Sequence, residues 1–533
     1  MQYKNNVTLL LSLTVYAVVC VFFFHYERLT GDATLYLSIA EKYIRGDFSN
    51  AINGYWGPLL SWLLIPFLYF GASHLSAINA LNLIVGILTI LGVWKLSYRF
   101  EMSDNIRTFI LIPLVPILVF ISLIEPMDFL LLCILVFYLD TIFNKNYSAQ
   151  ISNAFYAGTL GALAYFSKPY GFPFFISHFT IFNILHYSAA SSKEQKRNVL
   201  RNSIVGFIIF ALFSGIWISL ISNKYGHLTF SNQGRGVFAS LGPGSEHDTL
   251  EKGDPIFYEG FFEPPNESAL VIYEDPSYAR KKTWNPLEAP DLFNHFVGNF
   301  LKNIVAVIKT YESYSRLSII IVIAYFLLLL EQPFINFLSR RDLMYPLLTL
   351  ILFTGGYTFF HIEARYLWIA NILLLLMGGK VFNILFQKEF FKNNIARYTL
   401  ILLFILSFTF SPLKSSYAIG NASLNKEMFL LGEQLQGQFD IKGNIASNRM
   451  RVETGKHDSW HKTFRLSYWL GSRYYGQAKE SISDNDLEKE LMKFEIDYFF
   501  YWEDNFNVPI FLQKYREVTD GAVPGLKIYS LQE

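Results

Sequence analysis

The sequence predicts a mainly α-helical, polytopic membrane protein with about eleven transmembrane helices and a small C-terminal α/β domain outside the cytoplasm. Three observations lead to this fold class. Of the 533 residues, 52% are apolar and only 16% are charged, which is too apolar for an ordinary soluble chain. Apolar runs near membrane-spanning length recur along the chain, and basic residues gather in alternate connections between them.

Most of these apolar runs are long enough, or nearly long enough, to cross a bilayer. A further run at 58–70 is shorter than the ~17 residues that a perpendicular span requires, and it contains Pro58 and Pro66. No small-residue cleavage site follows the first run, so we expect it to remain as a span. The predicted spans lie at 7–24, 75–94, 108–124, 127–143, 151–166, 172–187, 204–221, 313–330, 343–360, 366–386 and 398–410.

The positive-inside rule decides whether 58–70 crosses, because each additional crossing inverts everything that follows it. If 58–70 does not cross fully, the basic residues of the connections all fall in the cytoplasm. We therefore expect a re-entrant or interfacial helix there, a cytoplasmic N-terminus and an extracytoplasmic C-terminus, in the inner (plasma) membrane. The basic residues concerned are Lys4, Lys95, Arg99, Arg107, Lys145, Lys193, Lys196, Arg197, Arg201, Arg340, Arg341, Lys388, Lys392 and Arg397.

This orientation divides the chain into a transmembrane domain at 1–412 and a soluble α/β domain at 413–533. The external face receives a first loop at 25–57, a long loop at 222–312, a short turn at 361–365 and the tail. The turn-rich long loop predicts irregular structure with short helices. The tail alternates between strand-like and helix-like segments, at 443–447, 484–494, 496–501 and 525–531.

Several functional classes lack support. The net charge is +1 and no basic cluster is interleaved with aromatic residues, so no nucleic-acid partner is expected. Cys20 and Cys133 both lie in apolar runs, where neither a disulfide framework nor a thiolate metal site is expected. No P-loop, HExxH, GxSxG or dinucleotide fingerprint is present, which argues against nucleotide-driven chemistry and zinc or serine hydrolysis.

Acidic residues fall at the outer membrane boundary. Asp32 opens a predicted interfacial helix at 31–46, where it serves either as a simple N-cap or as a base for an acceptor hydroxyl. Glu125 and Asp128 occupy a short external turn, which is either water-exposed or part of a cavity. Together with Asp32 they would form a paired-carboxylate site for base catalysis or for a divalent cation.

Cationic residues reach the same level and break the positive-inside pattern. They are Lys168, in Ser167-Lys-Pro169, and His361 and Arg365, in His361-Ile-Glu-Ala-Arg-Tyr366. One interpretation makes them snorkelling anchors. The other makes them ligands of a departing phosphate, for which arginine offers a bidentate fork and lysine a compact charge.

At these residues the chain resembles the GT-C superfamily of polyprenyl-phosphate-sugar-dependent glycosyltransferases. Within it, the chain is similar to bacterial relatives of protein O-mannosyltransferases and to aminoarabinose transferases, a glycosyltransferase family 39-like group. The resemblance rests on Gly31-Asp32, Tyr36, Ala40, Gly46-Asp47, Tyr55, Pro58-Leu59, Asp128, Ser167-Lys168-Pro169 and Glu363-Ala364-Arg365-Tyr366. The chain departs from the family pattern at Trp56-Gly57, where a second proline is common, and at Ala364, inserted between Glu363 and Arg365.

The resemblance implies a catalytic group and a substrate-binding group. Asp32 would be the base or the acceptor-positioning acid, with Asp128 a second acid, and Glu125 completes the acidic set. Lys168 and Arg365 would contact the donor phosphate. The remaining expected substrate contacts are Tyr55, His361, Glu363 and Tyr366.

The implied reaction is inverting single displacement from a polyprenyl-phosphate sugar to an extracytoplasmic acceptor, which is a protein, a lipid or a glycan of the cell envelope. No cofactor and no metal are expected, although some superfamily members bind a divalent cation. A transporter or flippase of lipid-linked saccharides and an envelope polysaccharide polymerase or ligase are the alternatives. A transporter more often carries charges in the middle of its spans and inverted repeats, and neither is evident here.

Overall fold

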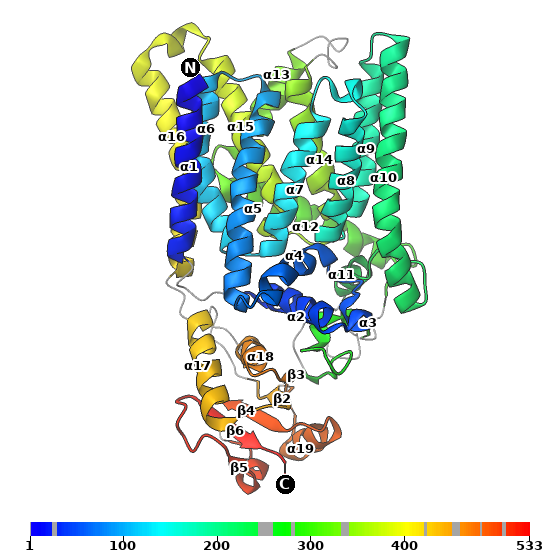
Figure 1. The fold of residues 1–533 in the computed structure, drawn as a ribbon, viewed down its shortest axis with the longest axis vertical. Helices are drawn as coiled ribbons and strands as arrows, with labels where there is room; N and C mark the ends of the chain where they lie inside the picture. Colours follow the sequence, from blue (N-terminus) through cyan, green and yellow to red (C-terminus); the bar gives the residue numbers. More distant parts are fainter. Residues whose placement is uncertain are drawn as a thin grey trace.

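The computed structural model describes residues 2–23, 29–243, 260–278, 283–331, 340–420, 424–449, 459–479, 482–503 and 508–532. A long helical bundle carries a smaller lobe, which contains the sheet, at one end (Figure 1). The N-terminus lies at the opposite end of the bundle from this lobe (Figure 1). The expected fold class, a helical membrane domain with a small α/β domain, is confirmed.

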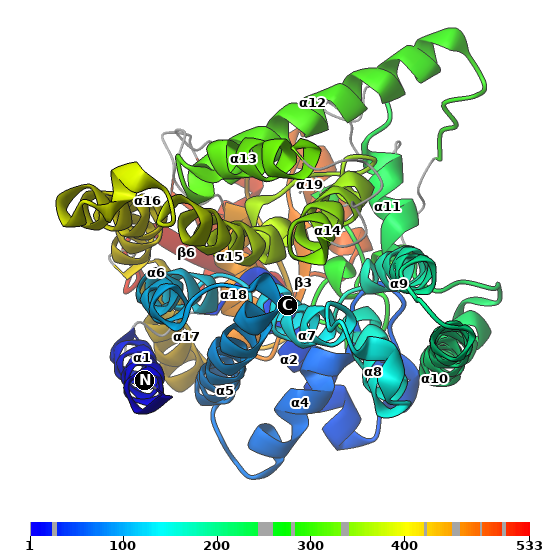
Figure 2. The ribbon, with the colours of Figure 1, turned by 90° about the horizontal axis from the view of Figure 1, so that it is seen from above.

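Each of the eleven apolar runs falls on helical structure in the bundle. Within the described residues, six helices are long and apolar enough to span a membrane by themselves. Other bundle helices are shorter, yet they lie beside the long ones in both views (Figures 1 and 2). The bundle helices are α1 (Gln2–Phe23), α5 (His74–Ser97), α6 (Asp104–Ser122), α7 (Pro126–Ile142), α8 (Ser152–Ser167), α9 (Gly171–Ser188), α10 (Lys193–Tyr225), α13 (Ser318–Leu330), α14 (Arg341–Tyr357), α15 (Trp368–Leu385) and α16 (Asn394–Gly420).

Two predictions, one about the long external loop and one about the span that follows it, need correction. The loop does not consist only of irregular structure and short helices, because α12 (Pro290–Tyr314) is a regular helix of 25 residues. The span expected at 313–330 is also not a single helix. Its first two residues end α12, and the rest of its helical part is α13, which meets α12 at an angle of 106°. α12 therefore leaves the bundle sideways (Figure 2). Its alternating apolar and polar faces are typical of a helix in the membrane interface.

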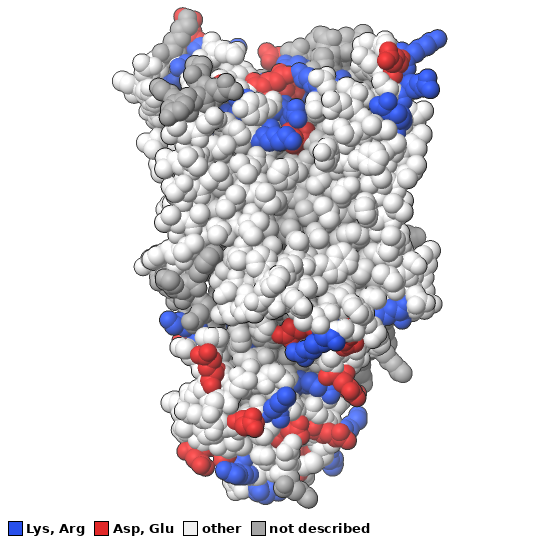
Figure 3. Space-filling view, viewed as in Figure 1, with Lys and Arg blue, Asp and Glu red and all other residues white. Residues whose placement is uncertain are grey.

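The surface separates into charged ends and an uncharged middle. On the face shown in Figure 3, Lys, Arg, Asp and Glu gather above and below a broad band that has none. The upper end carries basic residues from the connections predicted to be cytoplasmic. Two of them, Lys95 and Arg99, both pair with Asp140, at 3.1 and 2.8 Å. This distribution is the one that a membrane-spanning bundle requires.

Three short helices lie at the lower end of the bundle, near the lobe (Figure 1). They are α2 (Gly31–Arg45), α3 (Phe48–Ala51) and α4 (Pro58–Tyr69). α4 has only 12 residues and contains Pro66. It does not run the length of the bundle, in keeping with the expected interfacial helix at 58–70.

The lobe is built on a six-stranded mixed sheet with strand order β1-β3-β2-β4-β6-β5. β2 runs parallel to β3 and β4, and the other pairings are antiparallel. Sequence patterns had located β2, β4, β6 and α19, but not β3, α17 or α18. The elements are β1 (Gly260–Phe261), β2 (Asn444–Ser447), β3 (Arg473–Gln477), β4 (Tyr498–Trp502), β5 (Arg516–Glu517), β6 (Leu526–Ser530), α17 (Leu424–Phe439), α18 (Ser459–Trp469) and α19 (Asp484–Lys493).

The first strand comes from the long external loop and not from the C-terminal segment. Gly260 and Phe261 pair with Gln477 and Gly476 at the edge of the sheet. The long loop is therefore shared between the bundle and the lobe. α16, in turn, continues through residue 412, where the sequence suggested a domain boundary, to Gly420.

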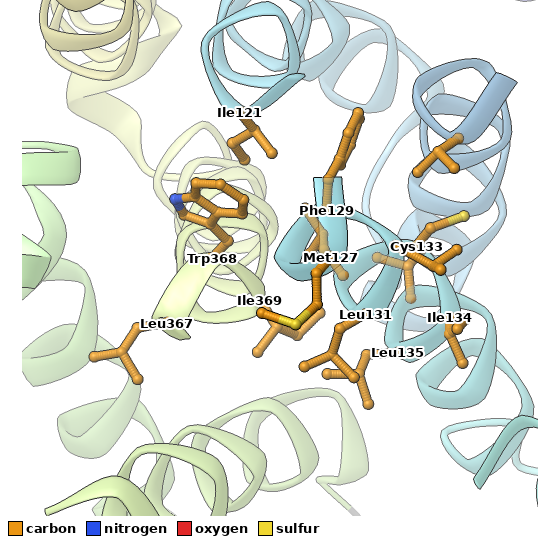
Figure 4. Packing of buried hydrophobic residues seen from close by; sticks show 14 of the residues in the cluster. Ile121, Met127, Phe129, Leu131, Cys133, Ile134, Leu135, Leu367, Trp368 and Ile369 are labelled. Carbon is orange, nitrogen blue, oxygen red and sulfur yellow. The ribbon is translucent and has the colours of Figure 1, made fainter. Parts of the chain in front are cut away.

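Apolar packing joins the bundle into one core, while a smaller cluster around Phe499 and Leu491 fills one side of the sheet. Figure 4 shows a part of the large cluster, where Met127 and Phe129 of α7 lie near Ile121 of α6 and Trp368 of α15. Buried side chains of this kind come from positions far apart in the sequence. They fix the start of α7 against the start of α15, and this contact brings the polar residues of both helices together.

Candidate active site

α2 presents Asp32 at the lower end of the bundle. The helix begins after Thr30, whose side chain accepts a hydrogen bond from the Ala33 N–H at 3.3 Å, and it ends at Gly46, which adopts a left-handed conformation with φ of 78°. These bounds match the helix predicted at 31–46. The N-cap is thus Thr30, so the interpretation of Asp32 as a simple cap is wrong. Asp32 lies in the first turn and its carboxylate points elsewhere.

Arg365 is the centre of the site. It lies in the short helix η9 (Ala364–Leu367), directly before α15. Its Nη1 is 2.8 Å from Asp32 Oδ2 and 3.3 Å from Glu125 Oε1. Its Nε is 2.6 Å from Glu363 Oε2 and 3.7 Å from Asp128 Oδ2. One guanidinium therefore draws together four carboxyl groups that come from three separate stretches of the chain.

A second ion pair lies behind Arg365. Lys168 Nζ is 2.6 Å from Asp128 Oδ1, and the two side chains are only 4% and 1% exposed. The Lys168 ammonium also lies 3.5 Å above the ring of Tyr366, a cation–π contact. This burial excludes a water-exposed turn for Asp128 and a solvent-facing anchor for Lys168. A buried pair is costly to break, because either partner alone would be an uncompensated charge.

The surroundings shift the pKa values of two of the carboxyl groups in opposite directions. Burial raises the pKa of Glu125 well above its ordinary value, and the nearby Asp32 carboxylate raises it further. Thr30 Oγ1 lies 2.8 Å from Glu125 Oε2. For Glu363 burial also opposes ionisation, but Arg365 and a hydrogen bond from Tyr366 outweigh it and lower its pKa. Burial thus disfavours ionisation of Glu125, whereas the partners of Glu363 favour its ionised form.

A cavity of about 470 Å³ opens beside this cluster. Glu125 and Asp128 do not line it, although both lie within 4 Å of the Arg365 guanidinium. Seven of the nine expected site residues do line it: Asp32, Tyr55, Lys168, His361, Glu363, Arg365 and Tyr366. His361 is the most exposed of these, and its Nε2 lies 3.8 Å from Glu363 Oε1.

Aromatic residues that the sequence did not single out as site residues form much of the cavity wall. The rings of Tyr170 and Tyr357 lie 3.8 Å apart, and Tyr357 stacks on Tyr366 with centroids 5.3 Å apart. Trp56 and Tyr273 also line the cavity. No local motif marks these residues, because aromatic side chains make up 17% of the chain. The long loop adds the helix α11 (Gln233–Ser240), part of which faces the same space.

Gly57 allows the turn that carries Tyr55 and Trp56 to lie close to the backbone just before Lys168. A Cβ atom at Gly57 would overlap the backbone carbonyl oxygens of Phe166 and Ser167, at the end of α8. The φ of Gly57 is an ordinary −65°. Glycine is therefore required here by the close approach of two backbone segments and not by the backbone conformation. The departure from the family pattern at Trp56-Gly57 has a physical reason in this contact.

The charges of the site decide what it can bind. Four carboxyl groups face two full cations, Arg365 and Lys168, so an incoming anion must compete for cations that are already paired. The exchange is easier at Asp32 and Glu363, whose side chains are 27% and 37% exposed, than at Asp128, which is buried. No group of three or more His, Cys, Asp or Glu side chains that could hold a metal ion occurs in the described part of the chain. Metal-independent chemistry stays a prediction.

No protein-family model and no curated protein matches the sequence. Solved structures do match. ArnT from Cupriavidus metallidurans bound to undecaprenyl phosphate aligns with a TM-score of 0.55 and 11% identity, covering 98% of this chain and 97% of that one. Its apo form gives 0.54 and 11%, covering 97% of both chains.

An archaeal protein has a similar architecture. The oligosaccharyltransferase AglB from Archaeoglobus fulgidus, in complex with an inhibitory peptide and a dolichol-phosphate, aligns with a TM-score of 0.50 and 12% identity. The alignment covers 92% of this chain and 69% of AglB. At identities this low, the structural alignments establish similarity of fold alone. The chain shares the fold of these ArnT and AglB structures.

Proposed function

We propose that the protein is a membrane glycosyltransferase that moves a sugar from a polyprenyl-phosphate donor to an acceptor outside the cytoplasm. The observation that carries this proposal is the Asp32–Arg365 pair, a carboxylate and a guanidinium 2.8 Å apart on the wall of one cavity. A base for an acceptor hydroxyl and a cation for a phosphate are the two groups that such a transfer needs. The lipid phosphates named for ArnT and AglB agree with this donor class.

The donor phosphate would bind at Arg365. Arginine presents a planar fork that suits phosphate, and Arg365 lines the cavity at the boundary of the bundle, where the headgroup of a lipid donor lies. Lys168 also lines the cavity, but Asp128 and the ring of Tyr366 hold it in place. We therefore assign Arg365 the direct contact and Lys168 a weaker electrostatic contribution. Binding of phosphate at Arg365 would release Asp32 from its ion pair.

The released Asp32 carboxylate would act as the base. It takes the proton of the acceptor hydroxyl while the hydroxyl oxygen attacks the anomeric carbon, and the bond from that carbon to the phosphate oxygen breaks. The polyprenyl phosphate leaves with the bonding electron pair, and Arg365 stabilises the added charge. The configuration of the sugar inverts, since there is one displacement. This scheme uses no nucleotide and no metal.

The site would lie outside the cytoplasm. Lys95 and Arg99 lie at the C-terminal end of α5, which points away from the lobe (Figure 1), and the positive-inside rule assigns this end of the bundle to the cytoplasm. The N-terminus would then be cytoplasmic and the C-terminal domain extracytoplasmic. The charged cluster lies at one end of the bundle and not at its midplane, which favours transfer over a transporter.

Turnover with defined donors tests this function. The purified protein in lipid nanodiscs would receive labelled polyprenyl-phosphate hexoses and pentoses, with the envelope fraction of cells that lack the protein as the acceptor probe. We expect label to enter the envelope fraction with the wild type and with Glu41→Gln, a control on the same helix outside the cavity. We expect a loss of about 10²- to 10⁴-fold with Asp32→Asn. Full turnover by Asp32→Asn would refute the mechanism.

A further inference from the structure

A short piece of the long external loop, residues 270–275, is fastened to the bundle by buried polar groups. Its Glu274 forms an ion pair with Lys42 of α2, and the two side chains are only 2% and 3% exposed. Ser38 Oγ, one helical turn before Lys42, donates to Glu274 Oε2 at 2.8 Å. The Leu270 N–H donates to the same oxygen at 3.1 Å. A single carboxylate thus ties the segment both to α2 and to its own first residue.

Asn53 completes this attachment from the opposite direction. Its Nδ2 donates to the Glu274 backbone oxygen at 2.6 Å. Its Oδ1 accepts from the N–H groups of Tyr55 and Trp56, at 2.8 and 3.0 Å. The Trp56 indole N–H then donates to the Tyr273 backbone oxygen at 3.1 Å. The turn that carries Tyr55 and Trp56 is therefore bonded to the segment that carries Tyr273.

The same segment is anchored to the lobe. The Tyr474 N–H of β3 donates to the Leu270 oxygen at 2.8 Å, and the ring of Tyr273 lies edge-on to Trp460 of α18 with centroids 5.7 Å apart. Next to it, Asp275 accepts from the Tyr225 hydroxyl at 2.5 Å. Segment 270–275 is thus held between the bundle and the lobe, with little freedom to move independently of either.

The fastened residues border the cavity. Tyr55, Trp56 and Tyr273 all line it, whereas Asn53 and Glu274 do not. The proposed phosphate ligand, Arg365, comes from the bundle, and Tyr273 comes from the loop next to the lobe. Tyr273, Trp56 and Asp32 line the same cavity, so an acceptor that reaches Asp32 would occupy the space that Tyr273 and Trp56 border.

We propose that Asn53 and Glu274 are positioning residues, which hold Trp56 and Tyr273 as a fixed acceptor-side wall of the cavity. This inference rests on the proposed glycosyl transfer and extends it from the donor to the acceptor. A buried ion pair contributes little net stability compared with apolar packing, but it favours one arrangement of its partners. The Glu274–Lys42 pair accordingly sets the position of the wall, and the three hydrogen bonds of Asn53 set its distance from the turn at Tyr55.

Isosteric variants separate this role from folding. Asn53→Asp keeps the oxygen that accepts from Tyr55 and Trp56, but replaces the donor to Glu274 with a second oxygen, which repels the carbonyl. Glu274→Gln leaves Lys42 without its partner, and the double variant Lys42→Gln/Glu274→Gln restores a neutral pair. Glu267→Gln, on the exposed part of the same loop, is the matched control.

Three measurements would be made on each variant in nanodiscs. Hydrogen exchange of the amides at 269–278 reports whether the segment loosens, without any need for activity. Binding of undecaprenyl phosphate reports the donor side. Transfer from a labelled polyprenyl-phosphate sugar to a titrated envelope fraction reports the KM for the acceptor separately from kcat.

We expect Asn53→Asp and Glu274→Gln to exchange faster at 269–278 and to raise the acceptor KM by about tenfold or more. Undecaprenyl phosphate should bind within about twofold of the wild type, and the double variant should recover most of the acceptor KM. An unchanged acceptor KM despite faster exchange, unchanged exchange, or a parallel loss of undecaprenyl phosphate binding would overturn the proposal. Absence of transfer by the wild type would instead refute the glycosyl transfer on which it rests.

Discussion

Arg365 donates a hydrogen bond of 2.8 Å to Asp32, a residue 333 positions earlier in the chain. The pair joins the first helix outside the membrane to the entrance of α15, and both residues face the same cavity. In the proposed mechanism Asp32 is the base, and here it is paired with Arg365, the cation that the donor phosphate would use. In that mechanism the donor phosphate would activate Asp32 by taking Arg365 from it.

The buried Lys168–Asp128 pair should behave as one unit. Replacement of Lys168 by Met leaves the Asp128 carboxylate buried and unpaired on that side, which should lower the free energy of unfolding by about 3–5 kcal/mol. The double variant Lys168→Met/Asp128→Asn should recover most of this loss, because no isolated charge remains. Denaturation of the four proteins in detergent gives the interaction energy as a double-mutant cycle. Additive losses would show that the two residues do not interact.

Glu125 should make stability depend on pH. Its pKa is raised by burial and by the nearby Asp32, so the folded state holds a proton that the unfolded state releases above about pH 4.3. The stabilisation is therefore complete at low pH and is lost as the pH rises towards the folded-state pKa. Glu125→Gln copies the protonated form. Its unfolding temperature should fall less with rising pH than that of the wild type, and equal slopes would contradict the protonated assignment.

Gly57 should tolerate no side chain. In Gly57→Ala the new methyl group would overlap the carbonyl oxygens of Phe166 and Ser167, and relief of this overlap should cost about 1–3 kcal/mol. It should also lower transfer activity, because the wall at Tyr55 and Trp56 would move away from Lys168. Gly215→Ala in α10 is the control, since a Cβ there has no neighbour within 4 Å. Equal unfolding temperatures for the two variants would argue against the close approach.

Cysteine labelling should reveal which end of the bundle faces the cytoplasm. Both native cysteines are buried, so the background should be low. A membrane-impermeant maleimide should label Lys489→Cys, on the lobe, in intact cells from which any outer barrier has been removed. It should label Lys145→Cys, at the other end of the bundle, only after permeabilisation. Both side chains are exposed, at 77% and 58%. The reverse pattern would overturn the proposed orientation.

Much of this fold could be predicted from the sequence, because each membrane-spanning helix requires a long apolar run that is visible in the local sequence. Apolar runs and basic connections reveal helices and orientation without knowledge of their neighbours. α2 was predictable for the same reason, since Gly31 and Gly46 mark its bounds and its apolar spacing is regular. β1 was not predictable, because a strand of two residues has no pattern of its own and exists only through its pairing with β3.

The site was only partly predictable for a related reason. Unusual charges at the membrane boundary identified Asp32, Lys168 and Arg365 individually, because an ionisable group there is costly without a partner. Nothing local showed that four carboxyl groups converge on Arg365, which depends on how α2, α7 and α15 pack. The contributions of Trp56, Tyr273 and α11 to the cavity were equally hidden, because they arise from long-range contacts between the first external loop and the long one.

The most direct test compares donor binding with transfer in Asp32→Asn. If donor phosphate and Asp32 compete for Arg365, loss of the carboxylate charge removes a competitor. The variant should then bind undecaprenyl phosphate in nanodiscs at least as tightly as the wild type, while transfer to the envelope fraction falls by about 10²- to 10⁴-fold. Weaker binding of undecaprenyl phosphate by Asp32→Asn, or transfer at the wild-type rate, would contradict the account.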